Sequence, residues 1–121
     1  MGSQYPAERF QERVARLVES VPISLTVRDP AGRLVGVCLG LTDFAYWLFL
    51  TGLGAVRDCA GRGIGRALVK RALAAAGGEE NIILYACAHP GALPFYRKIG
   101  MEPAQDVMVY DHIDWTPFTV T

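Results

Sequence analysis

The sequence predicts a single α/β domain that spans residues 1–121 and contains a mixed β-sheet. Two features of the chain predict this fold class. An alternating segment and an apolar segment joined by turn residues indicate a β-hairpin. Further along, an apolar strand, a glycine-rich loop, an amphipathic helix and another apolar strand follow one another. Because a strand–helix–strand order places its two strands in parallel, the sheet should hold both parallel and antiparallel pairs.

Composition limits the classes of function. The 12 Lys and Arg residues balance the 12 Asp and Glu residues, so the chain lacks the basic surface on which nucleic-acid binding depends. Cys38, Cys59 and Cys87 are widely spaced and form no CxxC pair, which predicts neither a metal site nor a disulfide framework. These cysteines, and an N-terminus without the pattern of a secretory signal, favour the cytoplasm.

One apolar segment is long enough to cross a membrane. Between Leu34 and Val56 the only charged residue is Asp43. The Thr42-Asp43 pair divides the segment into two lengths that are typical of strands, and its glycines weaken a helix. We therefore expect two neighbouring strands rather than a transmembrane helix, with Asp43 in the turn between them.

The N-terminal part is predicted to be a helix followed by a hairpin. Apolar residues recur at helical spacing over Ala7–Ser20, and Pro22 ends this helix. Ile23–Arg28 alternates apolar and polar residues, which is typical of a half-buried strand, and Leu34–Leu41 is the returning strand. The segment Asp29–Arg33 between them combines proline with glycine, as turns do.

A third strand is predicted from Tyr46 to Ala55. Its apolar run is unbroken, so we expect both of its faces to be buried and its place in the sheet to be central. Gly52 and Gly54 near its end indicate a bulge or a place where a ligand approaches the backbone. After a glycine loop, a helix runs to Ala76 and is ended by Gly77-Gly78. Its predicted buried stripe consists of Ile64, Leu68, Ala72 and Ala75.

The C-terminal part is predicted to contain a strand, a short helix and a last strand. Asn81–Ala86 is rich in β-forming residues and completes the crossover. Ala92–Ile99 is predicted to be a short helix that stops at Gly100, and Asp106–Asp111 to be the final strand. The tail at 115–120 is too apolar to stay in solvent. It either folds back on the domain or crosses to a second subunit, which leaves a homodimer open.

The glycine loop Gly61-Arg62-Gly63-Ile64-Gly65 follows a strand and opens a helix. Backbone N–H groups at a helix N-terminus bind phosphate, and Arg62, Arg66 and Lys70 add positive charge on one helix face. The glycine spacing matches neither the dinucleotide fingerprint nor the Walker A loop. The loop predicts a site for another polyphosphate ligand. The alternative is a tight turn whose glycines serve the geometry alone.

Two separated segments resemble the signature of the GNAT family of N-acetyltransferases, and the resemblance extends from about Leu34 to Tyr110. The first is Leu53-Gly54-Ala55, followed by Ala60-Gly61-Arg62-Gly63-Ile64-Gly65-Arg66-Ala67-Leu68. The second is Ile82-Ile83-Leu84-Tyr85-Ala86, followed by Ala92-Leu93-Pro94-Phe95-Tyr96-Arg97-Lys98-Ile99-Gly100-Met101. The resemblance implies a GNAT-like mixed sheet whose two central parallel strands splay apart, flanked by helices and shortened at the N-terminus.

The resemblance also implies an enzyme that moves the acetyl group of acetyl-coenzyme A to an amine of a small molecule or a peptide. The backbone of Leu53 and Ala55 then binds the acetyl and pantetheine amides. The implied pyrophosphate ligands are Ala60, Gly61, Arg62, Gly63, Ile64, Gly65 and Arg66. Tyr96 takes the place of the general acid that protonates the leaving thiolate, and the alternative for Tyr96 is a core aromatic. A phenol suits the task because the reference pKa values of phenol and thiol are about 10 and 8.5.

Some positions depart from the family pattern. Ala60 stands where an Arg or Gln is usual, Gly52 stands where an acidic residue often occurs, and only one helix precedes Ile23. These departures keep two alternatives open: a coenzyme A-binding module with little or no catalysis, and an interaction domain without a ligand. His89, just beyond the strand that ends at Ala86, is either a base near the thioester or a structural loop residue.

Overall fold

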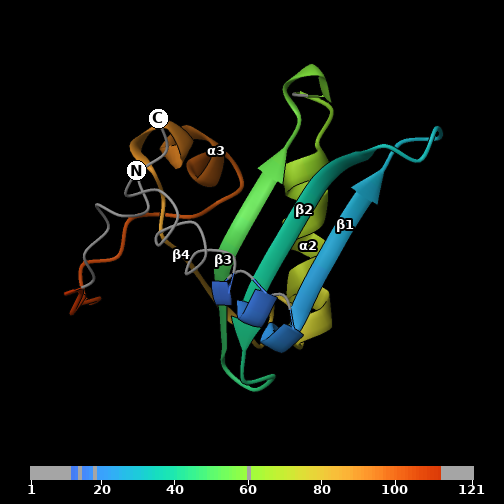
Figure 1. Ribbon diagram of the computed structural model, residues 1–121. Coiled ribbons are helices and arrows are strands. Elements are labelled where there is room, and N and C mark those ends of the chain that lie inside the picture. Colours follow the sequence, from blue (N-terminus) through green and yellow to red (C-terminus); the bar gives the residue numbers. More distant parts are fainter. Residues whose placement is uncertain (1–11, 14, 18, 60, 113–121) are drawn as a thin grey trace, which may run out of the picture. The chain divides into compact units, whose positions relative to one another are not determined.

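A four-stranded mixed sheet, with one long helix against one of its faces, forms the centre of the fold (Figure 1). The strands are β1 (Ile23–Arg28), β2 (Leu34–Thr42), β3 (Trp47–Ala55) and β4 (Ile83–Ala86), in the spatial order β1-β2-β3-β4. β2 pairs antiparallel with both β1 and β3, whereas β3 and β4 are parallel. The predicted hairpin and the predicted crossover are therefore confirmed.

The computed structural model describes residues 12–13, 15–17, 19–59 and 61–112. They fall in two units, Met1–Ser20 with Glu102–Thr121, and Val21–Met101. In the first unit the described residues between 12 and 20 are helical, as predicted, and the predicted start of that helix at Ala7 lies outside the described residues. The sheet and its two described helices belong to the second unit.

Two aspartates close the two hairpins. Asp29 Oδ1 accepts hydrogen bonds from the backbone N–H groups of Ala31 and Arg33 at 3.0 and 2.9 Å. Asp43 Oδ1 accepts three such bonds between β2 and β3, at 2.9, 2.8 and 3.0 Å, from Ala45, Tyr46 and Trp47. The backbone donors favour the ionised carboxylate and so lower the pKa of both aspartates. The predicted turn role of Asp43 is confirmed.

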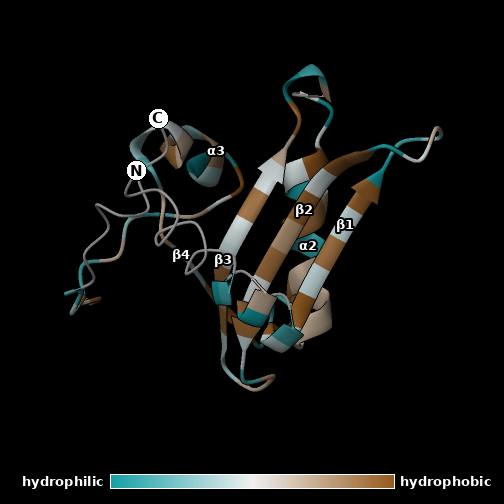
Figure 2. Ribbon diagram, viewed as in Figure 1, coloured by the Kyte–Doolittle hydropathy of each residue, from teal (hydrophilic) through white to brown (hydrophobic). Residues whose placement is uncertain are grey.

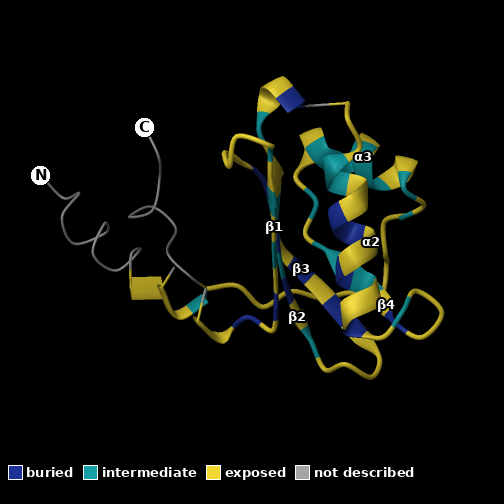
Figure 3. Ribbon diagram, turned by 90° about the vertical axis from the view of Figure 1, so that its right-hand side faces the viewer, coloured by how far each residue is buried: buried dark blue, intermediate teal, exposed yellow. Residues whose placement is uncertain are grey.

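α2 (Ile64–Ala76) covers one face of the sheet (Figures 1 and 3). It ends at Gly77 and Gly78, whose N–H groups both donate to the carbonyl oxygen of Leu73, at 3.1 and 2.8 Å. Ala75, which the sequence pattern placed in the buried stripe, is exposed. The buried residues of α2 are Leu68, Val69, Ala72 and Ala76. They differ from the predicted stripe because α2 packs against β1, β2 and β3 together.

Only one face of β3 is buried, which corrects the prediction that both faces are. Leu48 and Leu50 point into the core with 0% and 5% of their surface exposed, whereas Trp47 and Phe49 retain 46% and 37%. The reason is that α2 lies on one side of the sheet only. Hydropathy along the strands is shown in Figure 2. The unbroken apolar run of β3 thus combines a core face with a second apolar face that stays exposed. The predicted central place of β3 is confirmed.

The segment after α2 differs from the prediction in its boundaries. β4 begins at Ile83 instead of Asn81, because the N–H groups of Asn81 and Ile82 both donate to the carbonyl oxygen of Gly78 and close a turn. Beyond β4, the 3-10 turn η2 (Pro90–Ala92) leads into α3 (Leu93–Lys98). α3 is the predicted short helix, one residue shorter at each end.

The predicted last strand, Asp106–Asp111, is not found. In the first unit, residues 106–111 are exposed and form no ladder with any described segment. A short apolar segment without a hydrogen-bonding partner does not persist as a strand in water, which accounts for the difference. The apolar tail at 115–120 lies outside the described residues.

Candidate active site

The parallel strands β3 and β4 separate near the middle of β3. Their pairing ends at Leu50 and Ala86, while β3 continues along β2 to Ala55. The register between β2 and β3 skips Thr51, which is therefore a bulge. The bulge lies beside Gly52, where the sequence predicted one. It leaves a gap on the β4 side of residues 51–55.

The backbone N–H groups of Leu53 and Ala55 point into this gap. Val56, the residue after β3, donates its N–H to the carbonyl oxygen of Val35 at the β2 edge, at 3.0 Å. Successive N–H groups of an extended strand point to opposite edges, so those of Ala55 and Leu53 point away from β2. β3 therefore presents two backbone donors to the gap.

The glycine loop lies at the same end of the sheet, between β3 and α2. After the 3-10 turn η1 (Arg57–Cys59), Gly61 and Gly63 adopt φ of +82° and +78°, and a Cβ on either would meet nothing within 4 Å. The N–H of Ala67 donates to the carbonyl oxygen of Gly63 at 3.0 Å, so the N–H groups before Ala67 have no acceptor within the helix. They form the positive end of α2, a geometry suited to an anion. Ala60 lies outside the described residues.

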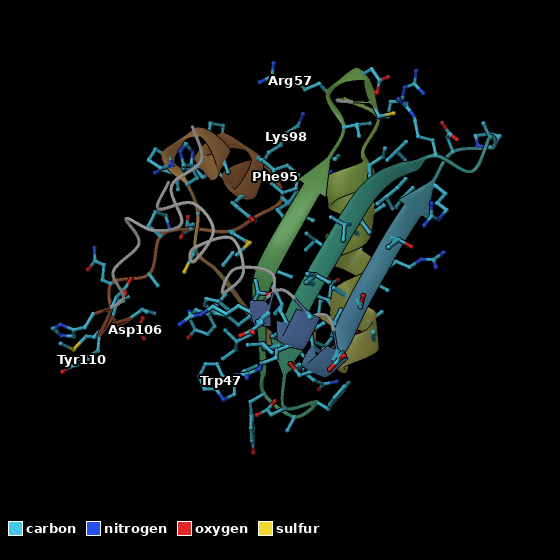
Figure 4. The ribbon with its side chains drawn as sticks, viewed as in Figure 1. Trp47, Arg57, Phe95, Lys98, Asp106 and Tyr110 are labelled. Atoms are coloured by element: carbon cyan, nitrogen blue, oxygen red, sulfur yellow. The ribbon has the colours of Figure 1, made fainter. Side chains whose placement is uncertain are left out.

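α3 carries Phe95 and Tyr96 to the cavity that the glycine loop also lines. Figure 4 labels Phe95 and Lys98 of this helix. A Cβ on Gly65 would lie 3.0 Å from the Phe95 ring, so this glycine allows α2 and α3 to approach closely. The rings of Phe95 and Tyr96 meet edge to face, with centroids 5.2 Å apart. Burial, with a smaller effect of Cys38, raises the pKa of the Tyr96 phenol above its ordinary value of about 10. Tyr96 therefore keeps its proton at neutral pH.

These elements border a cavity of about 610 Å³. The predicted site residues in its wall are Leu53, Ala55, Gly61, Gly63, Ile64, Gly65, Arg66 and Tyr96. Arg62, predicted with them, is exposed on the loop and does not line the cavity. The wall residues that were not predicted are Gly54, Cys59, Ala92, Phe95, Lys98 and Ile99. Phe95, Lys98 and Ile99 recur at i, i+3 and i+4, so the helical face around Tyr96 was a usable signal.

Positive charge gathers around the glycine loop. Arg66 and Lys98 line the cavity, one from each helix. Asp58, the one acidic residue between Arg57 and Lys70, pairs with Arg33, whose Nη2 lies 3.1 Å from Asp58 Oδ2. The hydrogen bond from Arg33 lowers the pKa of Asp58. The ion pair neutralises this carboxylate and leaves the loop with a net positive field.

His89 is engaged in its own turn. Its Nδ1 accepts a hydrogen bond from the backbone N–H of Gly91 at 3.0 Å. A neutral imidazole whose Nδ1 is an acceptor carries its proton on Nε2, so neither nitrogen is free to take a proton from an amine. Of the two roles considered for His89, this geometry supports the structural one.

The described residues contain no group of three or more His, Cys, Asp and Glu side chains that could hold a metal ion. No helix in this part of the chain is both long enough and apolar enough to span a membrane. The three cysteines are free thiols, of which Cys38 and Cys59 are buried and Cys87 is exposed.

Several solved acetyltransferases share this fold. A GNAT family protein from Streptococcus pneumoniae TIGR4 superposes with a TM-score of 0.71 at 20% sequence identity, over 85% of this chain and 79% of that one. The aminoglycoside 6'-N-acetyltransferase AAC(6')-IG from Acinetobacter haemolyticus gives 0.67 at 18% identity, over 89% and 82%. AAC(6')-Iy, in complex with the bisubstrate analogue CoA-S-monomethyl-acetylneamine, gives 0.66 at 13% identity, over 88% and 80%. A search of curated proteins found no match.

The sequence comparison assigns the family. The model of the Acetyltransferase (GNAT) family matches residues 2–101, which include both signature segments, the glycine loop and Tyr96. The mixed sheet with its splayed parallel strands is the fold of this family, and acetyl-coenzyme A is its acetyl donor. The chain belongs to the GNAT family of acetyl-coenzyme A-dependent N-acetyltransferases.

Proposed function

We propose that the protein acetylates an amine of a small molecule or a peptide by direct attack on acetyl-coenzyme A, with Tyr96 as the general acid. One observation carries the proposal. A single cavity is bordered by the end of β3 with its two free backbone donors, by the open N-terminus of α2 and by the protonated Tyr96. These are the parts that a thioester bearing a diphosphate requires.

The residues fit the donor at both of its ends. The N–H groups of Gly61, Gly63, Ile64 and Gly65, with the Arg66 side chain in the cavity wall, bind the diphosphate, and the open space over Gly61 and Gly63 admits it. The exposed Arg62 side chain on the loop adds positive charge beside the site. The N–H groups of Leu53 and Ala55 then bind the amide and acetyl oxygens of the pantetheine arm along the gap. Ala60 contributes only its backbone, since it has no polar side chain.

The chemistry needs one proton donor and one oxyanion site. The neutral amine nitrogen attacks the thioester carbonyl and a C–N bond forms, while a backbone N–H of β3 stabilises the oxyanion. The C–S bond then breaks, and the thiolate takes the proton of the Tyr96 hydroxyl. The amine gives its extra proton to solvent, and solvent returns a proton to Tyr96. The products are an acetamide and free coenzyme A.

Ligand-dependent thermal unfolding tests the donor site. Acetyl-coenzyme A should raise the Tm of the wild type, since a ligand at 100 times its Kd stabilises the native state by about 2.7 kcal/mol. Gly63→Asp should abolish the shift, because its carboxylate takes the place of the diphosphate. Gly32→Asp is the matched control. Gly32 has a similar φ of +88° and equally open space, but it lies in the β1–β2 turn. It should lower the Tm and keep the shift.

Two results would contradict the proposal. If millimolar acetyl-coenzyme A leaves the wild-type Tm unchanged, the donor site is wrong and an interaction domain without a ligand gains support. If the Tm rises but no amine in a broad screen releases coenzyme A thiol, the protein is a coenzyme A-binding module.

A further inference from the structure

The side of the sheet opposite α2, here called the outer face, is apolar where it meets the gap. Leu48 and Leu50 of β3 point to α2, so Trp47 and Phe49 point outward, and Trp47 projects from the start of β3 (Figure 4). On β4, Leu84 and Ala86 pack on the core, so Ile83 and Tyr85 point outward. The outer face of the two parallel strands therefore consists of large apolar and aromatic side chains.

Two of these side chains stand at the mouth of the gap. Phe49 and Tyr85 are register partners, and the next pair, Leu50 and Ala86, is the last one before the strands separate. Trp47 lies behind them, with its ring centroid 5.4 Å from that of Tyr85. Phe49, Tyr85 and Trp47 thus form one aromatic surface that leads to the place where the thioester carbonyl would lie.

The outer face offers the acceptor a route to that carbonyl. Under the proposed function, the donor occupies the cavity on the α2 side, between the glycine loop and Tyr96. A nucleophile adds perpendicular to the plane of a carbonyl group. The opposite approach, through the gap, starts from the outer face, and an acceptor that uses it must pass Phe49 and Tyr85.

The strands of the outer face offer no carboxylate to a polycation. The four strands contain no Asp or Glu, and their one charged residue is Arg28 of β1. An ammonium group beside these strands finds no countercharge, and its partial desolvation favours the neutral amine. The neutral form is the one that attacks, so such a surface activates a monoamine and repels an acceptor with several ammonium groups.

We infer that the acceptor is a primary amine attached to an aromatic or apolar group, which packs on Phe49 and Tyr85 while its nitrogen enters the gap. This inference rests on the proposed function and specifies its substrate. It separates this chain from an aminoglycoside or polyamine acetyltransferase, whose acceptors are polycations.

Release of coenzyme A thiol from acetyl-coenzyme A, measured with four amines, tests the inference. The probes are 2-phenylethylamine, ethylamine, spermidine and kanamycin. We expect kcat/KM for 2-phenylethylamine to exceed that for each of the other three by at least about tenfold, since a hydrophobic pocket separates such groups by factors of this size.

Variants locate the specificity. Phe49→Thr should raise KM for 2-phenylethylamine about tenfold or more with little change in kcat, and should leave ethylamine kinetics within about twofold. Leu34→Thr is the matched control, because Leu34 is similarly exposed, 44% against 37% for Phe49, but belongs to neither strand at the gap. Both residues are exposed and Thr suits strands, so both variants should fold.

The outcomes distinguish a failure of the inferred acceptor from a failure of the proposed function. Preference for spermidine or kanamycin overturns the inference and leaves the proposed function standing. Equal loss of activity toward 2-phenylethylamine and ethylamine in Phe49→Thr also overturns it, because the ring would then have no specific contact. An unchanged Tm with acetyl-coenzyme A overturns the proposed function itself, whatever the amine.

Discussion

The two faces of the sheet differ in how closely their side chains are packed and how far they are buried. On the α2 face, Cys38 and Leu48 are fully buried, and Gly36 is packed so closely that a Cβ would come within 2.7 Å of Ile64 Cγ2. On the outer face, Trp47 and Phe49 of the same sheet remain exposed. One face is a close-packed core that continues into the donor cavity, and the other is an open apolar surface that borders the gap.

This difference separates two kinds of functional information. Under the proposed function, the α2 face holds the acetyl donor with a glycine loop, a bulge and a protonated phenol. Under the further inference, the outer face contacts the acceptor. The solved relatives share the fold with this chain at identities of 20% or less. Identities this low do not transfer an acceptor from those proteins to this chain.

The largest expected effect is on the α2 side. Tyr96→Phe keeps the ring and its packing and removes only the acidic proton. A positioned general acid contributes about 10²–10⁴-fold, or about 3–5 kcal/mol of barrier, so kcat with a good acceptor should fall by that factor. The affinity for coenzyme A, measured by calorimetry, should stay within a few-fold.

Tyr46→Phe is the control for this substitution. Tyr46 precedes β3 at the end remote from the gap and is 66% exposed, so loss of its hydroxyl should not change turnover. Equal kcat in wild type and Tyr96→Phe, with chemistry rate-limiting, would remove Tyr96 from the mechanism.

A second prediction concerns the packing of the α2 face. Leu48 is fully buried beneath α2, and its truncation leaves a cavity that the core cannot close. Leu48→Ala should therefore lower the free energy of unfolding by about 2–5 kcal/mol, measured by urea denaturation. A loss below 1 kcal/mol would mean that α2 does not pack against β3 as described.

The third prediction concerns the pH dependence of kcat and kcat/KM, to which Tyr96 on the α2 side and the acceptor amine at the outer face contribute differently. Tyr96 acts as an acid only while protonated, and burial raises its pKa, so kcat should not fall until the pH exceeds about 10. The strands that border the gap contain no Asp, Glu or His, and His89 Nδ1 is already bonded. Hence kcat/KM should rise about tenfold per pH unit below the pKa of the acceptor amine, as its neutral fraction rises. A plateau that begins near neutral pH would instead reveal a base on the protein.

The sequence predicted the α2 side better than the outer face. The glycine loop, the end of β3 and Tyr96 lie in separate segments of the sequence, and the structure brings the loop glycines, Leu53, Ala55 and Tyr96 to one cavity. Burial of β3 was predicted wrongly because an apolar run does not reveal whether both of its sides are covered. Cys59 lines the cavity through the tertiary placement of η1, which local spacing does not encode, whereas Lys98 shares a helical face with Phe95 and Ile99. The strand expected at 106–111 was predicted wrongly because an apolar run does not reveal whether a partner strand lies beside it.

The smallest expected effect is that of truncating a second leucine, this time on the outer face. Leu41 lies on the outer face of β2, where it is the register partner of Phe49, and 45% of its surface is exposed. Leu41→Ala removes the same atoms as Leu48→Ala, but water replaces them and no cavity forms. Since only part of the side chain leaves water on folding, the loss in the free energy of unfolding should be about 1 kcal/mol or less in the same urea experiment. A loss as large as that of Leu48→Ala would show that the outer face is covered in solution, and the open route for the acceptor would then be closed.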